Sequence, residues 1–305
     1  MRILVTGASG LLGLNLSLQM AGKHKIIGVD RQKLAKVPFE LLKADLLDAD
    51  VVPRFLDEFQ PDALIHCAAN ADVDACELDP DNVQRLNADL PGDLAVACFD
   101  RNIRFAHIST DAVFDGTKEG IYTEEDGPNP LGVYAKTKLD GERAVLEANP
   151  NAIVARVNFF GWSLNGARSL SEFFVNSLYA GKQVNGFDDV WFCPMFVGDL
   201  ADTLLGMLEK NLLGLYHVVG SSAITKYEFG RAIARQFGFS EELIKPISVS
   251  ESGLSAKRSQ NLRLSVHKLS TALGQEIPNF STGLTKFYTQ YQQGYPQKLQ
   301  SYQQL

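Results

Sequence analysis

The sequence predicts an α/β fold built on a doubly wound parallel sheet with helices on both faces. Short runs of β-branched and other apolar residues alternate with longer stretches of helical spacing through the first half of the chain. The connections between them are short, and a glycine-rich turn follows the first run. Such alternation requires right-handed crossovers between parallel strands, which places helices on the two faces of one sheet.

Most of the predicted strands are short and lie within the first 160 residues. They cover residues 2–6, 25–29, 62–67, 103–108 and 152–157, and one more strand is expected just before Asp45. Helices are predicted at 11–21 and 130–148 from the spacing of their apolar residues. A further helix is indicated before the 103–108 strand, where four apolar residues recur at every fourth position: Leu86, Leu90, Leu94 and Cys98.

The alternation becomes irregular after about residue 160. An aromatic and glycine-rich segment, FFGWSLNG, leads into predicted helices at 168–180, 198–209, 225–237, 265–273 and 280–292, with a strand at 214–219. We interpret residues 161–305 as a smaller, partly discontinuous C-terminal substrate-binding lobe. Within it, the helix and strand near 197–220 return to the first domain. The glutamine-rich end of the chain is expected to fray after about residue 293.

The composition excludes several classes of protein. The 305 residues include 29 Lys and Arg against 36 Asp and Glu, and the formal net charge of −7 argues against a nucleic-acid partner, which needs a basic surface. No apolar run reaches the roughly 18–20 residues of a membrane-spanning helix, and the first residues do not resemble a secretory signal. The four cysteines form no C-x-x-C pair, so we expect no metal site and a cytoplasmic location.

Three glycines follow the first predicted strand at a spacing of three residues. Gly7, Gly10 and Gly13 form G-x-x-G-x-x-G between that strand and the first helix. Glycines in this position let the backbone approach a pyrophosphate that lies on the helix N-terminus. The pattern therefore predicts that residues 1–160 bind a dinucleotide. The loop contacts are expected from Gly7, Ser9, Gly10, Leu11, Leu12 and Gly13.

The second strand ends in a pair of residues that bears on the choice of dinucleotide. Asp30 lies 17 residues after Gly13, close to where such folds place the carboxylate that binds the adenosine ribose. Arg31 follows at once, and an arginine there suits a 2′-phosphate. NADH and NADPH are therefore both open as the cofactor. Further cofactor contacts are predicted after the next two strands, at Asp45, Leu46, Ala68, Ala69 and Asn70.

A tyrosine and a lysine stand four residues apart in the predicted 130–148 helix. Tyr134 and Lys138 therefore share one helix face. A phenol with a pKa of about 10 transfers its proton poorly at neutral pH, but a neighbouring ammonium group stabilises the phenolate. Thr110, at the end of the strand IRFAHIST, offers a hydroxyl that polarises a substrate oxygen. His66 and His107 are interpreted as structural groups of the sheet rather than as a proton relay.

These segments together resemble one enzyme family. MRILVTGASGLLG, DALIHCAANADVDACE, ISTDAVFDG and GPNPLGVYAKTKLDGE are similar to the extended short-chain dehydrogenase/reductases, and within them to the dTDP-4-dehydrorhamnose reductase (RmlD-like) group. The resemblance implies a Rossmann-type, NAD(P)H-dependent oxidoreductase acting on CH–OH groups. It also implies that Tyr134 donates a proton, Lys138 holds the nicotinamide ribose and Thr110 hydrogen-bonds the keto oxygen. The expected reaction converts dTDP-4-dehydro-L-rhamnose to dTDP-L-rhamnose in dTDP-rhamnose biosynthesis.

The resemblance also suggests which residues bind the substrate. Ala112 stands where the group often has an aromatic residue, and Phe159 where it commonly has a tryptophan, so the sugar pocket is built differently here. Asn15 replaces a metal-linked glutamate, which argues against a magnesium-bridged dimer. Arg258 is expected to meet a diphosphate, with Arg263 as the competing candidate. The expected substrate-binding residues are Asp111, Ala112, Phe114, Asn158, Phe159 and Arg258.

Two other functions stay open at this point. One is a different reaction on the same fold, such as the epimerisation or reduction of another nucleotide-sugar. The other is non-catalytic, because proteins with this pattern include the regulatory subunit of methionine adenosyltransferase, which binds a dinucleotide and a partner enzyme. For the reductase, the expected partner is a small-molecule nucleotide-sugar, with neither nucleic acid nor membrane, and a homodimer stays open.

Overall fold

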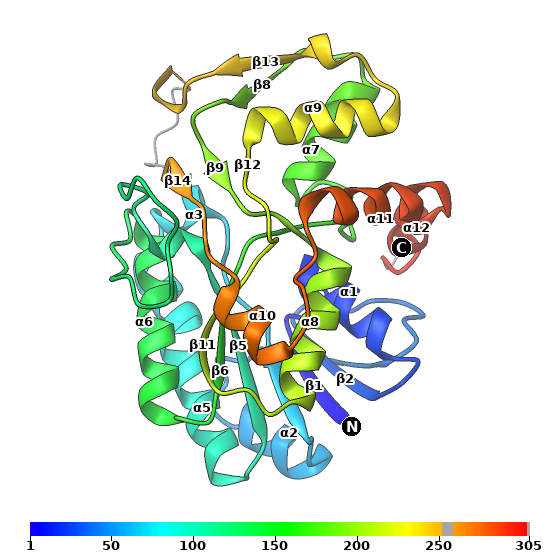
Figure 1. Ribbon diagram of the computed structural model, residues 1–305. Helices are drawn as coiled ribbons and strands as arrows, with labels where there is room; N and C mark the ends of the chain where they lie inside the picture. The colour runs from blue at the N-terminus through cyan, green and yellow to red at the C-terminus, as the bar shows by residue number, and fades with distance from the viewer. Residues whose placement is uncertain (252–258, 304–305) are drawn as a thin grey trace.

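A seven-stranded parallel sheet forms the centre of the computed structural model, which describes residues 1–251 and 259–303 (Figure 1). The strand order is β11-β6-β5-β4-β1-β2-β3. The chain first builds β1, β2 and β3 in one direction and then returns to place β4 on the other side of β1. This reversal marks the crevice in which open α/β sheets bind their ligands. The strands are β1 (Arg2–Thr6), β2 (Lys25–Asp30), β3 (Glu40–Lys43), β4 (Ala63–His66), β5 (Arg104–Thr110), β6 (Ile153–Val157) and β11 (Gly214–Val218).

Helices cover both faces of the sheet, as the sequence predicts. In β1, Ile3 and Val5 belong to one core cluster and Leu4 to another, because alternate residues of a strand face opposite sides. The first cluster includes residues of α1 (Leu11–Met20) and α8 (Val197–Glu209). The second includes residues of α2 (Val51–Phe59), α5 (Leu90–Asp100) and α6 (Val133–Ala148). The doubly wound α/β prediction is confirmed.

The helix expected around Leu86 to Cys98 is present, but it is interrupted. Two short helices, α3 (Val73–Cys76) and α4 (Pro80–Gln84), precede it, and a π-helical turn at Arg85–Asp89 leads into α5. Pro91 lies in the first turn of α5, where its missing N–H costs no helical hydrogen bond. The irregular turn keeps Asn87 buried next to the segment that follows β4, where its side chain accepts a hydrogen bond from the Asn70 amide.

The C-terminal lobe contains short strand pairs that the sequence pattern does not reveal, because most have only two residues. β7 pairs with β10, β8 with β13, and β9 with both β12 and β14. The strands are β7 (Phe159–Phe160), β8 (Val184–Phe187), β9 (Trp191–Phe192), β10 (Met195–Phe196), β12 (Ile224–Thr225), β13 (Ile244–Ile247) and β14 (Asn261–Leu262). The helices of the lobe are α7 (Leu170–Tyr179), α9 (Lys226–Phe237) and α11 (Phe280–Gln292), whereas α10 (His267–Leu273) packs beside β11 of the central sheet (Figure 1).

Residues 295–302 are folded, so the expectation of fraying after residue 293 is wrong. A further helix, α12 (Tyr295–Gln300), follows Gly294, which adopts a left-handed φ of 72°. Leu299 and Tyr302 are buried, and the Tyr302 carbonyl accepts a hydrogen bond from the Ala35 amide at 2.8 Å. Two apolar side chains docked on the domain outweigh the polar composition of this segment.

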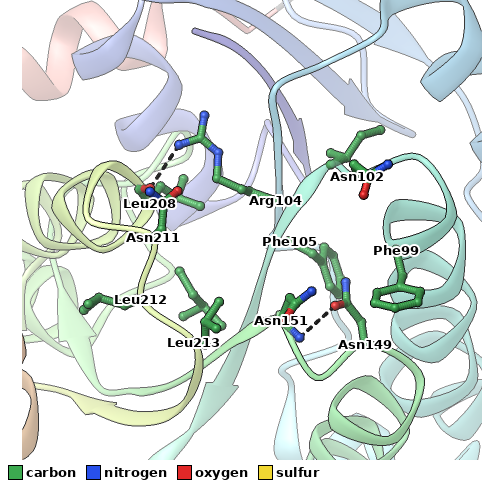
Figure 2. A pocket seen from close by; sticks show the side chains of 12 residues that line it. Phe99, Asn102, Arg104, Phe105, Asn149, Asn151, Leu208, Asn211, Leu212 and Leu213 are labelled. Atoms are coloured by element: carbon green, nitrogen blue, oxygen red, sulfur yellow. Dashed lines mark hydrogen bonds between the residues drawn. The ribbon is translucent and has the colours of Figure 1, made fainter.

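A cavity opens at the amino ends of β5 and β6 (Figure 2), on the edge opposite the glycine loop. Its wall includes Phe99, Asn149 and Leu213, together with Asn102 and Asn211. The last two adopt positive φ angles of 55° and 51°, as asparagines often do just after helices. Ligands of doubly wound folds bind at the carboxyl ends of the strands, so we expect the functional site at the edge that carries the glycine loop, opposite this cavity.

Candidate functional site

The glycine loop forms a backbone cradle at the end of β1. A Cβ atom on Gly7 would lie 2.7 Å from the Ala68 nitrogen, and one on Gly13 would lie 2.2 Å from the Gly7 oxygen. Gly7 also has a φ of 66°, which side chains rarely adopt. Helix α1 starts directly after Gly10 without a side-chain cap or an acidic residue in its first turn. Its amide groups and dipole are therefore available to an anion.

One end of the cleft lies beside Asp30, at the end of β2. Its carboxylate accepts hydrogen bonds from the backbone nitrogens of Ser9 at 2.9 Å and Gln32 at 3.0 Å, which fix its orientation toward the glycine loop. Arg31 is exposed on the same rim. The predicted contact residues Gly7, Ser9, Gly10, Asp30, Arg31, Asp45, Leu46, Ala68 and Ala69 all line this part of the cleft. The geometry suits an adenosine ribose and either a 2′-hydroxyl or a 2′-phosphate.

The other end of the cleft gathers the predicted catalytic residues. Thr110 ends β5, while Tyr134 and Lys138 lie in the first two turns of α6. The cavity that these three residues line also includes the predicted residues Leu11, Leu12, Gly13, Asp111, Asn158 and Phe159. Both parts of the cleft share Gly7, Gly10 and Arg168, so they form one continuous channel past the N-terminus of α1.

Helix α6 is held in place at its start and in its middle. The Glu77 carboxylate accepts a hydrogen bond from the Val133 amide at 2.8 Å, at the first turn of the helix. Deeper in the protein, Glu142 forms a buried ion pair with Arg156 of β6 at 2.7 Å. Glu142 also accepts a hydrogen bond from Ser109 of β5 at 2.5 Å. These contacts fix the height and rotation at which α6 presents its first two turns to the cleft.

Burial sets the proton affinities of the tyrosine and the lysine. It raises the pKa of Tyr134 to about 12, although a hydrogen bond with Thr110 opposes the shift. Burial lowers the pKa of Lys138 to about 8, against the attraction of Glu142. The lysine ammonium donates to the Ile108 carbonyl at 2.6 Å and lies 3.3 Å from His107 Nε2. The phenol is therefore protonated at neutral pH, the state needed to donate a proton.

Asp111 is a buried carboxyl group beside the predicted catalytic residues. It accepts hydrogen bonds from the Asn158 amide at 2.6 Å and from the Thr110 hydroxyl at 3.2 Å. Burial raises its pKa to about 6, against these hydrogen bonds. Two predicted substrate residues, Asp111 and Asn158, thus occupy the cleft as a bonded pair that also orients the threonine hydroxyl.

Three other predicted residues lie outside the lining of the cleft. Phe114 is fully buried in a separate core cluster, where its ring stacks on Tyr122 with centroids 4.2 Å apart. Ala112 is partly buried behind Thr110, to which its amide donates at 3.2 Å. The Asn70 backbone is held by the Asn87 side chain through two hydrogen bonds of 2.9 Å. The structure thus gives Phe114 a core position, because the chain turns at Asp111–Val113 and directs that ring inward.

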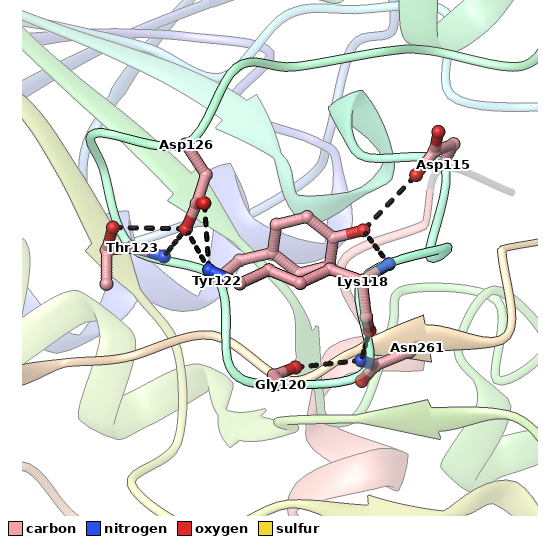
Figure 3. Close-up of polar contacts among 7 residues, drawn as sticks. All are labelled: Asp115, Lys118, Gly120, Tyr122, Thr123, Asp126 and Asn261. Carbon is pink, nitrogen blue, oxygen red and sulfur yellow. Dashed lines mark hydrogen bonds and ion pairs between the residues drawn. The ribbon is translucent and has the colours of Figure 1, made fainter.

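A polar network anchors the loop that follows Phe114 (Figure 3). Asp126 pairs with Lys118 at 2.7 Å, and the Tyr122 hydroxyl donates to Asp115 at 3.2 Å. The Asn261 amide donates to the Lys118 and Gly120 carbonyls and so ties β14 to this loop.

Of the two arginines expected to meet a diphosphate, only Arg263 lies within the described residues. Arg263 lies beside this network, bonded to the Asn261 and Glu119 oxygens and stacked over Trp191 at 5.6 Å, which makes it structural. Arg258 lies outside the described residues. The Trp162 ring packs in the core, stacked on Phe287 with centroids 4.1 Å apart.

Arg168 is a cleft residue that the sequence analysis missed. It precedes α7, contributes to both ends of the channel and is exposed. Its backbone nitrogen is fixed by Glu172, the residue that completes the capping box of α7 with Ser169. Among the described residues, its guanidinium group has no ion-pair partner. No local motif marks this residue; only the S-x-x-E capping pattern after it could have located the loop.

Asn15 is buried rather than placed at the surface. Its amide donates to the Leu11 and Trp162 carbonyls and its oxygen accepts from the Tyr295 hydroxyl at 2.9 Å, so this position joins α1 to the C-terminal lobe. In the described part of the chain, no cluster of three His, Cys, Asp or Glu side chains could hold a metal ion. No helix within those same residues has the length and apolar character needed to cross a membrane.

The parallel sheet, the glycine cradle and the Thr110, Tyr134 and Lys138 set define a Rossmann-type protein of the extended short-chain dehydrogenase/reductase class. The chain belongs to the RmlD substrate binding domain family, which matches residues 1–293. The expected family membership is therefore confirmed.

Similar proteins carry different functional names. A probable low-salt glycan biosynthesis reductase, Agl14 of Haloferax volcanii, is 35% identical over 92% of this chain and 95% of its own length. The methionine adenosyltransferase 2 subunit beta of Mus musculus is 36% identical over 93% of this chain and 86% of its own. A solved dTDP-4-dehydrorhamnose reductase from Bacillus anthracis, in complex with NADP, has a TM-score of 0.86 and 25% identity, covering 95% and 99% of the two chains.

Proposed function

We propose that the protein is an NADPH- or NADH-dependent reductase of a 4-keto nucleotide-sugar, with dTDP-4-dehydro-L-rhamnose as the substrate. The observation that carries this proposal is the meeting of Thr110, Tyr134 and Lys138 in a channel that continues to the glycine loop and Asp30. The family and the NADP complex of a similar reductase support it.

The residues present fit a dinucleotide. The uncapped start of α1 suits the diphosphate, and Gly7 and Gly13 let the loop before it pack closely, because a Cβ atom at either position would collide with neighbouring backbone atoms. Asp30 and Arg31 would hold the adenosine ribose and its substituent, and Lys138 the nicotinamide ribose. The chemistry that a bound nicotinamide supplies is the hydride delivered to the keto carbon.

The chain's own residues supply the proton and orient the substrate oxygen. Tyr134 is protonated at neutral pH because burial raises its pKa, and its hydroxyl transfers the proton to the oxygen. The Lys138 ammonium stabilises the phenolate that remains. Thr110 turns its hydroxyl from Asp111 to the same oxygen, and Asp111 with Asn158 contacts the sugar hydroxyls. We assign Phe159, which lines the same cavity, to the sugar pocket.

The test compares Tyr134→Phe with wild type in NADPH and NADH oxidation driven by dTDP-4-dehydro-L-rhamnose, with product analysis. We expect turnover to fall by about 10²–10⁴-fold, since one general acid contributes that much, while cofactor affinity stays within twofold. The control is Tyr179→Phe, a change in an exposed tyrosine outside the cleft. Full activity of Tyr134→Phe would refute the proposed mechanism. Activity of the wild type on other nucleotide-sugars alone would redirect the substrate assignment.

A second candidate function is regulation of a methionine adenosyltransferase, favoured by the 36% identity to a subunit beta. In that case the protein would bind the partner enzyme with or without the catalytic tyrosine. Co-purification with a methionine adenosyltransferase, equal for wild type and Tyr134→Phe, together with no turnover of any nucleotide-sugar, would support this function.

For the location we propose the cytoplasm. All four cysteines are free thiols, which fits the reducing conditions of a cytoplasm.

A further inference from the structure

The ammonium group of Lys138 lies inside the protein rather than on its surface. The side chain is 2% exposed, and Nζ donates to the Ile108 carbonyl at 2.6 Å. A second atom, His107 Nε2, lies 3.3 Å from Nζ. Two of the three ammonium protons therefore have acceptors within β5, and one remains for a ligand in the cleft.

The chemistry of the contact fixes the state of His107. An ammonium group has only donors, so Nε2 must accept and the imidazole proton must lie on Nδ1. His107 is fully buried, and this burial, with the charge of Lys138, lowers the pKa of the imidazole well below its usual value. Nδ1 has no hydrogen-bond partner within the described residues. His107 is therefore a neutral acceptor whose other nitrogen is left unpaired.

The ring of His107 is held by a polar row across three strands. Thr6, His66 and His107 occupy neighbouring register positions on β1, β4 and β5. His66 Nδ1 bonds Thr6 Oγ1 at 2.7 Å, and the two imidazole rings stack with centroids 5.5 Å apart and planes at 21°. Stacked rings share no hydrogen bond, so the row fixes the ring of His107 without carrying protons along the sheet.

We propose that His107 is a positioning residue for the catalytic lysine. Its Nε2 and the Ile108 carbonyl bind two ammonium protons, keep the group charged despite its burial, and direct the third proton toward the cleft. This inference rests on the proposed function, in which that proton meets a ribose hydroxyl of the cofactor. The histidine then acts only through Lys138 and touches neither substrate nor cofactor.

Other groups also face the lysine and must be accounted for. Glu142 follows one turn later on α6 and favours the charged form, and Cys67, after β4, contributes in the same direction. Tyr134 lies one turn earlier, and burial keeps its hydroxyl neutral. His66 is neutral because burial lowers its pKa to about 3. None of these groups changes when only the side chain of His107 is replaced.

Because His107 Nε2 accepts a hydrogen bond from the charged form of Lys138, loss of this acceptor should lower the pKa of the lysine. Burial already lowers the pKa of Lys138 to about 8, and loss of the Nε2 acceptor removes a contact made by the charged form. A hydrogen bond to a charged group of this strength corresponds to a further decrease of about one pKa unit. Cofactor binding that requires the ammonium should then be lost at lower pH than in the wild type.

The experiment measures the dissociation constant of NADPH by fluorescence between pH 6 and 9.5. Wild type should lose affinity with a midpoint near 8, whereas His107→Leu and His107→Asn should shift the midpoint about one unit lower. Asparagine is too short to reach Nζ. His107→Gln, whose amide oxygen can accept at greater length, should restore most of the midpoint. The matched control is His217→Leu, which removes a buried imidazole of the same sheet that contacts neither Lys138 nor His107 among the described residues.

The possible results separate this inference from the proposed function. If wild type does not bind NADPH or NADH at any pH, the proposed function fails first. If it binds and a folded His107→Leu or His107→Asn keeps the wild-type midpoint, the positioning role is overturned. A midpoint shift of the same size in His217→Leu would also overturn it, since the loss of any buried imidazole would then explain the effect. Thermal unfolding of each variant shows that the comparison uses folded protein.

Discussion

The Asp30 carboxylate accepts a hydrogen bond from the backbone nitrogen of Ser9 at 2.9 Å and thereby joins the end of β2 to the glycine loop. The bond spans 21 residues of sequence and holds an acidic group at the rim of the cleft. Arg31, the next residue, lies on the same rim with its side chain exposed. An acceptor for a ribose hydroxyl and a cation for a 2′-phosphate therefore stand side by side.

This arrangement predicts the effect of Arg31→Gln on cofactor selectivity. The dissociation constant of NADPH should increase by about tenfold, because one charge-assisted contact to the 2′-phosphate is lost, while that of NADH should change less than twofold. Titration of each cofactor by fluorescence measures both values. Lys33→Gln removes the same charge from an exposed neighbour outside the cleft and serves as the control. An equal loss of affinity for both cofactors would show that Arg31 does not contact the 2′-phosphate.

Arg168 should bind the part that the two cofactors share. It lies where the two ends of the channel meet at Gly7 and Gly10, the loop expected to hold the diphosphate. In Arg168→Gln, the dissociation constants of NADPH, NADH and ADP should all increase by about 5–20-fold, whereas that of 2′-AMP should not. Lys182→Gln, an exposed change away from the cleft, is the matched control. A loss confined to NADPH would move Arg168 to the adenosine end.

The sequence predicted those parts of the site that depend on local spacing. The glycine loop follows from its place between a strand and a helix, and the shared face of Tyr134 and Lys138 follows from the helical repeat. Arg168 could not be predicted, since its contribution depends on how the loop before α7 folds across the cleft. Phe114 shows the converse case. It lies in a motif that resembles a substrate site, yet the turn at Asp111–Val113 directs it into a core.

The short strands of the C-terminal lobe could not be predicted from the sequence for another reason. A two-residue strand such as β9 has no periodicity to detect and exists only because β12 and β14 pair with it from distant parts of the chain. The folded segment 295–302 is similar, because Leu299 and Tyr302 are separated by the polar residues Gln300 and Ser301 and gain their order from contacts with the rest of the protein.

The Glu142–Arg156 ion pair should matter for folding as well as for the site. Both side chains are below 5% exposed, with 3% for Arg156 and 4% for Glu142, so loss of one partner leaves an uncompensated charge in the core. Glu142→Ala is expected to lower the free energy of unfolding by about 3–5 kcal/mol. Glu241→Ala provides the contrast, since its ion pairs with Arg231 and Arg235 lie at the surface and should contribute little. Urea denaturation of both variants measures the difference.

A small effect of Glu142→Ala would mean that water reaches Arg156 when the carboxylate is removed. Because Glu142 also accepts from Ser109 and faces Lys138, a second readout is available. The folded variant should lose NADPH affinity at lower pH than wild type, since the lysine loses a favourable negative charge. Glu241→Ala should leave that pH midpoint unchanged.

Because of Asp111, part of the stability of the protein should decrease as pH rises. Most carboxylates have the opposite effect, since their pKa is lowered by folding. Burial raises the pKa of Asp111 from 3.8 to about 6, so the folded state binds a proton more tightly than the unfolded chain. The stabilising contribution of the protonated Asp111 carboxyl group is fully present below the unfolded pKa and is lost as pH increases through 6. Above that pH the buried charge lowers the free energy of unfolding by a constant amount. Asp111→Asn removes that penalty and keeps an amide of the same shape between Thr110 and Asn158. At pH 7 the variant should be more stable than wild type by about 1–3 kcal/mol, which is what a shift of about two pKa units allows after one hydrogen bond is altered.

The same variant should lose most of its advantage at pH 4, where the wild-type carboxyl group is protonated in the folded state and the buried charge is absent. Urea denaturation at pH 7 and pH 4 tests this, and Asp115→Asn is the control, because hydrogen bonds of the exposed loop lower the pKa of Asp115 and its removal should destabilise the protein at pH 7. An Asp111→Asn protein that is less stable at pH 7 than at pH 4, relative to wild type, would show that the hydrogen bonds to the carboxylate outweigh its burial. A gain in stability together with a loss of turnover would instead indicate that the strained carboxylate is retained for the substrate.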